Sequence, residues 1–305
     1  MSPPAVYVSS ATGTQGGAIA RQLRAIGWEV HATTRDPEST AARALSSIGV
    51  HVTRGDWDDR VALRASIAGC QKVFLNLFPD LQNPTRETQQ AEAIIAIAKA
   101  SGVTQLVYSS VFPSRPGGPA DNELIARVRA GKAAIEKAVL AAGVSSATVI
   151  QPGFFMANFL LPKGGFYFPG ASETGLFTVA FHPDTRLPLV DHEDIAAFVL
   201  AAFQDPERFD GKTITLASEV VEFRKAVELI AGATGRDIRA RYLSDEQAQA
   251  QIGTNPMLGS QITARRMADL VDMDDVRGWG VPLGTFAAFL EREREAVEET
   301  YHTTK

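Results

Sequence analysis

The sequence predicts an α/β fold, a doubly wound parallel sheet with helices on both faces. Short apolar segments alternate with helical patterns from the N-terminus to about residue 155, which is typical of repeated αβ units. A glycine stands two or three residues before the next expected strand at Gly27, Gly49, Gly69, Gly102 and Gly143. Because glycine ends a helix readily in the left-handed conformation, these positions separate helices from strands.

Six strands and four crossover helices are expected in this part of the chain. The strands lie at residues 5–9, 29–34, 51–54, 72–77, 105–109 and 146–151, and the helices at 16–26, 58–68, 85–101 and 122–142. Within the helices, apolar residues four apart, such as Ile19 and Leu23, form one face for packing on the sheet. Such a fold binds its ligand outside the carboxyl ends of the strands, where the strand order reverses.

A glycine-rich turn follows the first expected strand. Small residues at this turn let a phosphate approach the backbone N–H groups at the N-terminus of the following helix. The strand, turn and helix together therefore predict a dinucleotide ligand. The residues expected to hold its pyrophosphate are Ser10, Thr12, Gly13, Thr14, Gln15 and Gly16.

Arg35 lies at the carboxyl end of the second expected strand, where a dinucleotide-binding fold contacts the adenosine ribose. A carboxylate at this position binds a free 2′-hydroxyl, whereas an arginine offers a planar cation to a 2′-phosphate. The sequence therefore favours NADP(H) over NAD(H). Alternatively, Arg35 faces solvent and pairs with Asp36 or Glu38.

Beyond Gly153 the alternation gives way to aromatic and glycine-rich stretches, such as residues 164–168. We expect residues 1–155 to form a Rossmann-type NAD(P)-binding domain, to which residues 186–217 return. Residues 156–305 are expected to form a smaller α+β lobe for a substrate or a partner. Further helices are expected at 191–203, 222–232, 261–271 and 283–301, and a strand at 212–216.

The composition excludes several classes of protein. Hydrophobic residues make up 45% of the chain and charged residues 21%, as in ordinary globular proteins. The net charge of -5 gives no broad attraction to nucleic acid or an anionic membrane. Cys70 is the only cysteine, so an intramolecular disulfide and a multi-cysteine zinc site are excluded. Neither a secretion signal nor a membrane span is expected, which points to a cytoplasmic protein.

No metal site is expected either. The sequence contains no His-Glu-x-x-His pattern. The acidic residues at 191–194 stand where a helix begins, and there they are explained by capping and by the helix macrodipole.

Several motifs together resemble those of the NmrA-like family of atypical short-chain dehydrogenase/reductases, which is related to isoflavone reductase-like proteins. They lie at residues 11–17 (Ala-Thr-Gly-Thr-Gln-Gly-Gly), 34–37, 55–56, 152–159 and 190–196. The resemblance implies that Asp56 contacts the adenine amino group, although it would alternatively cap the helix that begins near Asp58. Ser10 stands where the family usually has a glycine, and Gln151 where relatives often carry an arginine, which puts an anionic substrate in doubt.

Short-chain dehydrogenases generally polarise a carbonyl with a Tyr-x-x-x-Lys pair. Lys132 matches the lysine, but the tyrosine position is Val128, so conventional alcohol dehydrogenase chemistry is not expected. In the resembling isoflavone reductases, the single lysine of this helix is the proposed proton-transfer group. The resemblance implies this role for Lys132; alternatively, Lys132 only anchors the nicotinamide ribose.

Side chains near the carboxyl ends of two other expected strands complete this group of candidates. Ser109 and Ser110 follow the fifth strand, close to where reductases of this fold place a substrate-orienting hydroxyl. Asn76 and Phe78 follow the fourth strand and are expected to border the nicotinamide. All four would alternatively cap or close turns.

An aromatic segment begins at Pro152 and Phe154, which are expected to contact the nicotinamide end of the cofactor. Phe159 would extend it into an apolar wall beside the nicotinamide or would pack in the core. Tyr167 and His182 are the nearest candidates for an acid that replaces the missing tyrosine, although a histidine beside a proline is commonly a surface-loop residue.

Two functions agree with these residues. The first is an NADPH-dependent reductase of a small, largely apolar carbonyl compound or activated double bond. The alternative is a non-catalytic redox sensor that binds NADP and acts through a regulatory protein partner. A third possibility is a structural homodimer that retains a vestigial pocket and has no measurable affinity for a nucleotide. The oligomeric state itself stays open.

Overall fold

The structure, a computed structural model, describes residues 3–113 and 123–301. The described chain divides into two compact units. The first contains residues 3–111, 123–151 and 195–214, and the second contains residues 112–113, 152–194 and 215–301. The assignment of a cofactor to one part of the chain and of a substrate to the other stays a prediction.

Seven strands of one sheet dominate the first unit, in the order β10-β6-β5-β4-β1-β2-β3. Their bounds are β1 (Ala5–Val8), β2 (Glu29–Thr34), β3 (Val50–Arg54), β4 (Lys72–Leu75), β5 (Gln105–Ser109), β6 (Ser146–Pro152) and β10 (Thr213–Leu216). Neighbouring strands from β3 to β6 are parallel. The chain builds the sheet outward from β1 in one direction and from β4 in the other, which confirms the predicted doubly wound fold.

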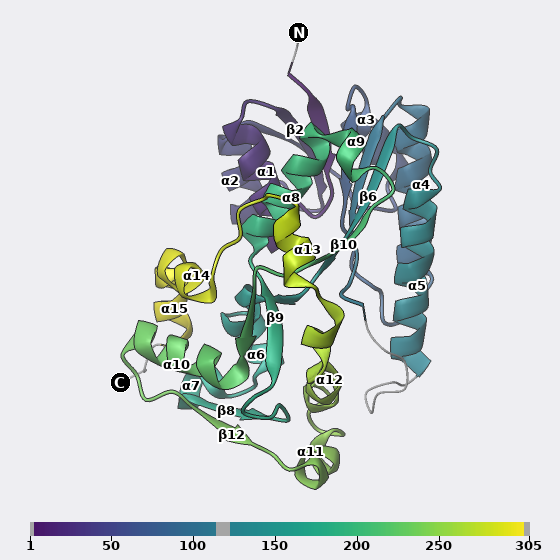
Figure 1. The fold of residues 1–305 in the computed structure, drawn as a ribbon. Coiled ribbons are helices and arrows are strands. Elements are labelled where there is room, and N and C mark those ends of the chain that lie inside the picture. Colours follow the sequence, from purple (N-terminus) through teal and green to yellow (C-terminus); the bar gives the residue numbers. More distant parts are fainter. Residues whose placement is uncertain (1–2, 114–122, 302–305) are drawn as a thin grey trace. The chain divides into compact units, whose positions relative to one another are not determined.

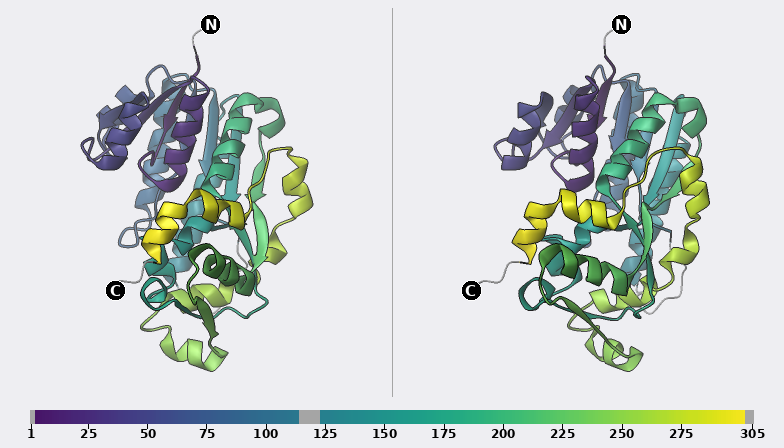
Figure 2. Two further views of the ribbon diagram at one scale, coloured as in Figure 1. Left: turned by 90° about the vertical axis from the view of Figure 1, so that its left-hand side faces the viewer. Right: turned by 60° about the vertical axis from the view of Figure 1, so that its left-hand side comes forward.

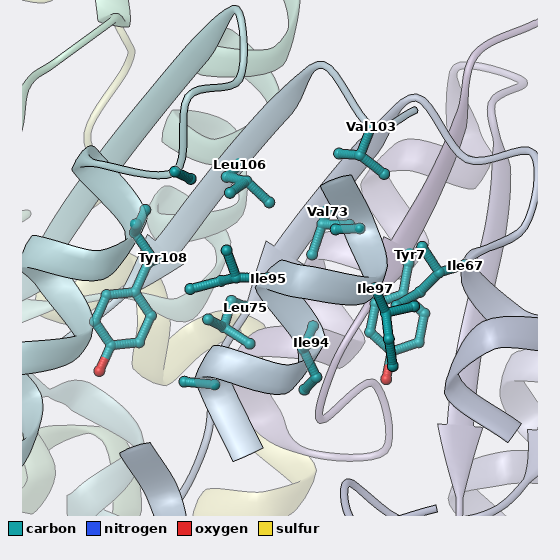
Figure 3. Packing of buried hydrophobic residues seen from close by; sticks show 14 of the residues in the cluster. Tyr7, Ile67, Val73, Leu75, Ile94, Ile95, Ile97, Val103, Leu106 and Tyr108 are labelled. Carbon is teal, nitrogen blue, oxygen red and sulfur yellow. The ribbon is translucent and has the colours of Figure 1, made fainter. Parts of the chain in front are cut away.

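Helices cover both faces of this sheet. They are α1 (Thr14–Ala25), α2 (Thr40–Ser47), α3 (Arg60–Ile67), α4 (Arg86–Ala100), α5 (Glu123–Leu140), α8 (His192–Gln204) and α9 (Pro206–Phe209). Apolar side chains of α3, α4 and α5 pack against alternate residues of β1, β4 and β5, as Ile67, Ile94, Leu75 and Leu106 show in Figure 3. The helices α1 and α2 lie across the opposite face (Figures 1 and 2), as right-handed crossovers require.

The glycines expected to end helices adopt the left-handed conformation, among them Gly27 (φ 81°) and Gly49 (φ 85°). The helix α2 was missing from the expected elements. Only Ala42 and Leu45 of α2 are buried, so its apolar pattern is too short to stand out. Its N-terminus is nevertheless capped by Ser39, whose side chain accepts a hydrogen bond from the backbone N–H of Ala42.

Two small sheets and a set of short helices make up the second unit. The sheets have the orders β11-β9-β7 and β12-β8. Their strands are β7 (Phe154–Phe155), β8 (Leu176–Val179), β9 (Arg186–Val190), β11 (Glu219–Glu222) and β12 (Arg239–Tyr242). The helices are α6 (Lys163–Tyr167), α7 (Ala171–Thr174), α10 (Phe223–Thr234), α11 (Asp245–Gln251), α12 (Met257–Ala264), α13 (Met273–Gly278), α14 (Phe286–Arg292) and α15 (Arg294–Thr300), with 3-10 turns η1 (Met156–Phe159) and η2 (Met267–Leu270).

The bounds predicted for two helices of this unit were wrong. The expected helix 261–271 is divided between α12 and η2, and Arg265, which follows α12, donates a 2.7 Å hydrogen bond to the backbone carbonyl of Ala180. The expected helix 283–301 is broken between α14 and α15 at Glu293, whose ψ of 25° departs from helical geometry. No helix in the described ranges has both the length and the apolar character that crossing a bilayer requires.

Candidate functional site

The glycine-rich turn packs directly on the start of α1. The backbone N–H of Gly13 donates a 2.9 Å hydrogen bond to the carbonyl of Ser10, and Ser10 itself has a φ of 52°. A side chain at position 16 would place its Cβ 2.4 Å from the same carbonyl oxygen. Gly13 is the N-cap of α1 and provides no side-chain cap, so the turn leaves room for a ligand at the N-terminus of this helix.

Four loops at the carboxyl ends of β1, β2, β3 and β4 line one hollow of about 490 Å³. Its position spans the point where the strand order reverses, which is where open α/β sheets bind ligands. The predicted cofactor residues that it brings together are Ser10, Thr12, Gly13, Arg35, Asp56 and Phe78. Thr34 and Gly55, which stand in the motifs at 34–37 and 55–56, also line it. The lining residues that were not predicted are Thr33, Trp57, Asp58, Pro79, Asp80, Arg86 and Gln90.

Arg35 is exposed at the rim of this hollow. The alternative partner Glu38 pairs instead with Arg43, at 2.8 Å between Oε2 and Nη2, and Asp36 accepts a hydrogen bond from the backbone N–H of Glu38. Within residues 3–113 and 123–301, the Arg35 guanidinium forms no hydrogen bond or ion pair. It therefore lines the hollow as a cation without a carboxylate partner in the described chain.

Asp56 closes the turn between β3 and α3. Its Oδ1 accepts hydrogen bonds from the backbone N–H groups of Asp58 and Asp59, at 2.9 and 3.0 Å. The cap of α3 itself is Asp59, whose side chain accepts from Val61 and Ala62. The alternative that Asp56 caps this helix is therefore wrong, since Asp56 stabilises only the turn that precedes it. Contact of Asp56 with adenine stays a prediction.

Arg86 joins two of the loops that line the hollow. Its guanidinium contacts Asp58 Oδ2 at 2.6 Å and Asp80 Oδ2 at 3.2 Å, and Gln90 donates a 3.0 Å hydrogen bond to Asp58. The hydrogen bond from Arg86 holds the pKa of Asp58 below its usual range. Local sequence patterns do not reveal this ion pair because 28 residues separate Asp58 from Arg86.

The end of β4 is tied to the glycine-rich turn. The hydroxyls of Ser9 and Ser10 both donate to the backbone carbonyl of Asn76, at 2.9 and 2.8 Å, and the N–H of Asn76 donates to Ser9. Asn76 is buried, whereas Phe78 is 68% exposed and lines the hollow. Of the two residues, only Phe78 therefore presents its side chain at the hollow.

Lys132 is 4% exposed and is surrounded by groups from three elements. Its Nζ donates a 3.0 Å hydrogen bond to the carbonyl of Leu77 and lies 2.5 Å from Oε1 of Glu87. The ring of Tyr108 lies 5.8 Å from the same nitrogen. Burial raises the pKa of the Glu87 carboxyl, and the Lys132 ammonium opposes that rise.

Neither Glu87 nor Tyr108 was predicted from the sequence. Glu87 begins the buried stripe of α4 that continues with Ala91, Ile94 and Ala98. A charged residue on an apolar stripe was therefore the available signal. Tyr108 is fully buried in the core, where burial raises the pKa of its hydroxyl well above the usual range.

The predicted substrate-orienting serines differ in their surroundings. Ser109 donates a 2.7 Å hydrogen bond to Oε1 of Gln15 in the first turn of α1. The Ser110 hydroxyl is buried, and no residue of the described chain forms a hydrogen bond with it. Gln15, Thr14 and Gly16 do not line the hollow.

The remaining candidates belong to the second unit. Phe154 contacts Tyr167, with ring centroids 5.5 Å apart, and Phe159, at 5.8 Å. Phe159 is 1% exposed inside an aromatic cluster, so it packs in the core of this unit and is not a free apolar wall. Burial raises the pKa of Tyr167, and His182 is exposed in a turn.

Pro152 is buried at the end of β6. The glycine that follows, Gly153, lies against backbone, because a Cβ there would meet the carbonyl oxygen of Pro188 at 2.2 Å. No set of three or more His, Cys, Asp or Glu side chains in residues 3–113 and 123–301 is arranged to hold a metal ion.

Comparisons with known proteins agree with this architecture. A model of the NmrA-like family matches residues 4–278. The NmrA-like family domain-containing oxidoreductase cpsB of Aspergillus campestris is 30% identical over 255 residues, which cover 77% of this chain and 74% of that protein. The NAD(P)H azoreductase of Xenophilus azovorans is 28% identical over 253 residues, which cover 81% of this chain and 80% of that protein.

Among solved structures, this chain is similar to NmrA, a negative transcriptional regulator, in complex with NADP. The TM-score is 0.74 at 18% sequence identity, and the match covers 100% of this chain and 99% of that one. The two proteins therefore share a fold.

Proposed function

Because the chain belongs to the NmrA-like family, we propose that it binds NADP(H) and reduces a small, largely apolar carbonyl compound or activated double bond. The observation that carries this proposal is the hollow of about 490 Å³ at the reversal of strand order, with the glycine turn on one side and Arg35 on its rim. We assign the cofactor to residues 1–155 and the substrate to residues 156–305.

The residues of the first unit fit a dinucleotide phosphate. The start of α1 is uncapped by a side chain, and a Cβ at Gly16 would meet the backbone of Ser10 and Ala11, so the turn packs this closely on the helix only with glycine there. We assign the pyrophosphate to this turn, from Ser10 to Gly16, and the 2′-phosphate to Arg35. Asp56 is assigned to adenine, and Asn76 and Phe78 to the nicotinamide end.

When bound, NADPH supplies a hydride for the substrate carbon. Reduction of a carbonyl also requires a proton at the oxygen, and we assign the delivery of this proton to the Lys132 ammonium. The alternative role of Lys132 is to anchor the nicotinamide ribose without transferring a proton. Ser110 is assigned to orienting the substrate, and Pro152 and Phe154 to contact with the nicotinamide. Tyr167 is a second candidate for the acid, since its phenol carries a proton at neutral pH; burial raises its pKa and so makes it a weaker proton donor than a free tyrosine.

Calorimetry with NADPH and NADH tests the cofactor assignment. Arg35→Ala removes charge-assisted hydrogen bonds to the 2′-phosphate, so we expect it to weaken NADPH binding by about 10- to 100-fold and to leave NADH binding unchanged. Arg43→Ala is the matched control, because Arg43 is a nearby exposed cation that pairs with Glu38 and does not line the hollow. Equal affinities of the wild type for NADPH and NADH would contradict the assignment.

Oxidation of NADPH, measured with a panel of carbonyl compounds, enones and azo compounds, tests the reaction. Azo compounds belong in the panel because an azoreductase is among the relatives. We expect turnover with at least one class and a sharp fall of kcat in Lys132→Ala. Binding of NADPH without turnover of any acceptor would contradict the reductase.

One observation favours a second function, a sensor that binds NADP and signals to a protein partner. The position of the usual tyrosine is Val128, so the helix that carries Lys132 supplies no phenol to a carbonyl. For a sensor, we expect the affinity for its partner to change when NADP is bound. Recovery of the same partner in equal amounts with and without NADP would contradict this function.

A further inference from the structure

The buried ion pair between Lys132 and Glu87 has no role in the fold that an apolar pair could not serve. The two side chains are 5% and 2% exposed, and they join α4 and α5, which run side by side (Figure 1). Taking two charges out of water carries a desolvation penalty that their attraction seldom exceeds. Well-packed apolar residues at both positions would therefore hold the two helices together at least as well.

The pair fixes the direction of the lysine side chain. An ammonium has three N–H groups; one donates to the carbonyl of Leu77, and Glu87 lies on a second side. The ring of Tyr108 lies on a third side of this nitrogen, with its centroid 5.8 Å from Nζ. The next residue after Leu77 is Phe78, which lines the hollow. Within residues 3–113 and 123–301, the oxygen atoms in contact with Nζ are those of the Leu77 carbonyl and the Glu87 carboxylate, which leaves the third N–H without an oxygen acceptor in the described chain.

We propose that Glu87 is a positioning residue that holds Lys132 against the Leu77 carbonyl, so that the remaining N–H of Lys132 contacts the nicotinamide end of the cofactor. This inference rests on the proposed function. Glu87 touches neither cofactor nor substrate in this scheme and acts only through Lys132. Its carboxylate keeps the lysine side chain in one orientation.

A double-mutant cycle on NADPH affinity tests this dependence without requiring turnover. We expect Glu87→Gln and Lys132→Ala each to raise the Kd for NADPH by about 10-fold or more, the size of the loss of a single charged contact. The double variant is expected to bind no more weakly than Lys132→Ala, because Glu87 has nothing left to position. Losses that multiply in the double variant would overturn the proposal, and so would wild-type affinity in Glu87→Gln.

Two further variants separate positioning from folding. Glu87→Asp keeps the charge and shortens its reach by one methylene, so it is expected to fold and to bind NADPH with intermediate affinity; this variant decides the question if Glu87→Gln does not fold. Glu136→Gln is the matched control, since Glu136 lies one turn further along α5 and bonds to Gln151. A Kd for Glu87→Asp equal to that of the wild type, or an equal loss in Glu136→Gln, would overturn the proposal.

The same measurements distinguish this proposal from the proposed function. A wild type that binds no NADPH overturns both. NADPH binding with independent effects of Glu87 and Lys132 overturns only the role of Glu87. Where turnover is observed, Glu87→Gln is expected to lower kcat at least tenfold with little change in the KM of the acceptor, and an unchanged kcat would count against the proposal.

Discussion

The hydroxyl of Ser109 donates a 2.7 Å hydrogen bond to the side-chain carbonyl of Gln15, so the end of β5 is tied to the first turn of α1. Both residues were expected to contact ligands. The contact gives them a shared structural role, because it fixes the helix start that follows the glycine-rich turn. Ligand contacts of either residue stay a prediction.

The variant Ser109→Ala removes this tie. We expect the free energy of unfolding to fall by about 1 kcal/mol, the usual loss for one hydrogen bond, as measured by urea denaturation. Ser110→Ala is the matched control, because no residue of the described chain bonds to its buried hydroxyl. That variant should stay within about 0.5 kcal/mol of the wild type, and equal losses in both variants would contradict this account.

Ser10 adopts the left-handed conformation, with a φ of 52°, and its hydroxyl donates to the carbonyl of Asn76. Ser10→Gly relieves the strain and loses the hydrogen bond, terms of about 1 kcal/mol each with opposite signs, so its unfolding free energy should stay close to that of the wild type. Ser10→Ala loses the bond and keeps the strain. Thermal and urea denaturation should show Ser10→Ala about 1 kcal/mol less stable than Ser10→Gly, and the reverse order would contradict this account.

The sequence predicted those features that neighbouring residues determine. The alternating apolar segments and the glycines that end helices, such as Gly27 and Gly49, depend on backbone preference and local periodicity, and the parallel sheet followed from them. The placement of Arg35 at a strand end likewise needed only the order of elements.

Contacts between distant elements were not predictable in the same way. Arg86 meets Asp58 across 28 residues, and nothing near either residue specifies the other. The partnership of Lys132 with Glu87 depends on the packing of α4 against α5. In the second unit, α12 ends beside Arg265, whose side chain donates a hydrogen bond to the carbonyl of Ala180. Local periodicity does not reveal this contact, so the helix predicted at 261–271 was too long.

Gly16 has no space for a side chain. A Cβ there would lie 2.4 Å from the carbonyl oxygen of Ser10 and 2.9 Å from Cα of Ala11, and both are backbone atoms that cannot move without displacing the turn. We expect Gly16→Ala to lose at least about 2 kcal/mol of unfolding free energy and at least about tenfold in NADPH affinity, measured by denaturation and by calorimetry.

A second glycine provides the control for Gly16→Ala. Gly232 lies in α10, and a Cβ there would meet nothing within 4 Å. Alanine has the higher helix propensity, so Gly232→Ala should stabilise the protein by about 0.5–1 kcal/mol and leave NADPH affinity unchanged. A Gly16→Ala variant that binds NADPH as tightly as Gly232→Ala would show that the turn does not hold the cofactor.

The stability of the first unit should depend on pH through His31, which lies in β2 and stacks on His51 of β3 with ring centroids 4.8 Å apart. Burial, and then the neighbouring His51, lower the pKa of His31, against a smaller opposing effect of Glu29. In the unfolded chain a histidine takes up its proton near pH 6.5. Between about pH 7 and 5 the unfolded state therefore binds more protons than the folded state, so the free energy of unfolding falls as the pH falls.

The variant His31→Phe keeps a ring against His51 and removes this titration. Urea denaturation of the variant at pH 7.5, 6.5 and 5.5 should therefore show an unfolding free energy that depends less on pH than that of the wild type. Parallel pH dependences in the two proteins would mean that His31 binds its proton equally well in the folded and unfolded states, contrary to its burial between two strands.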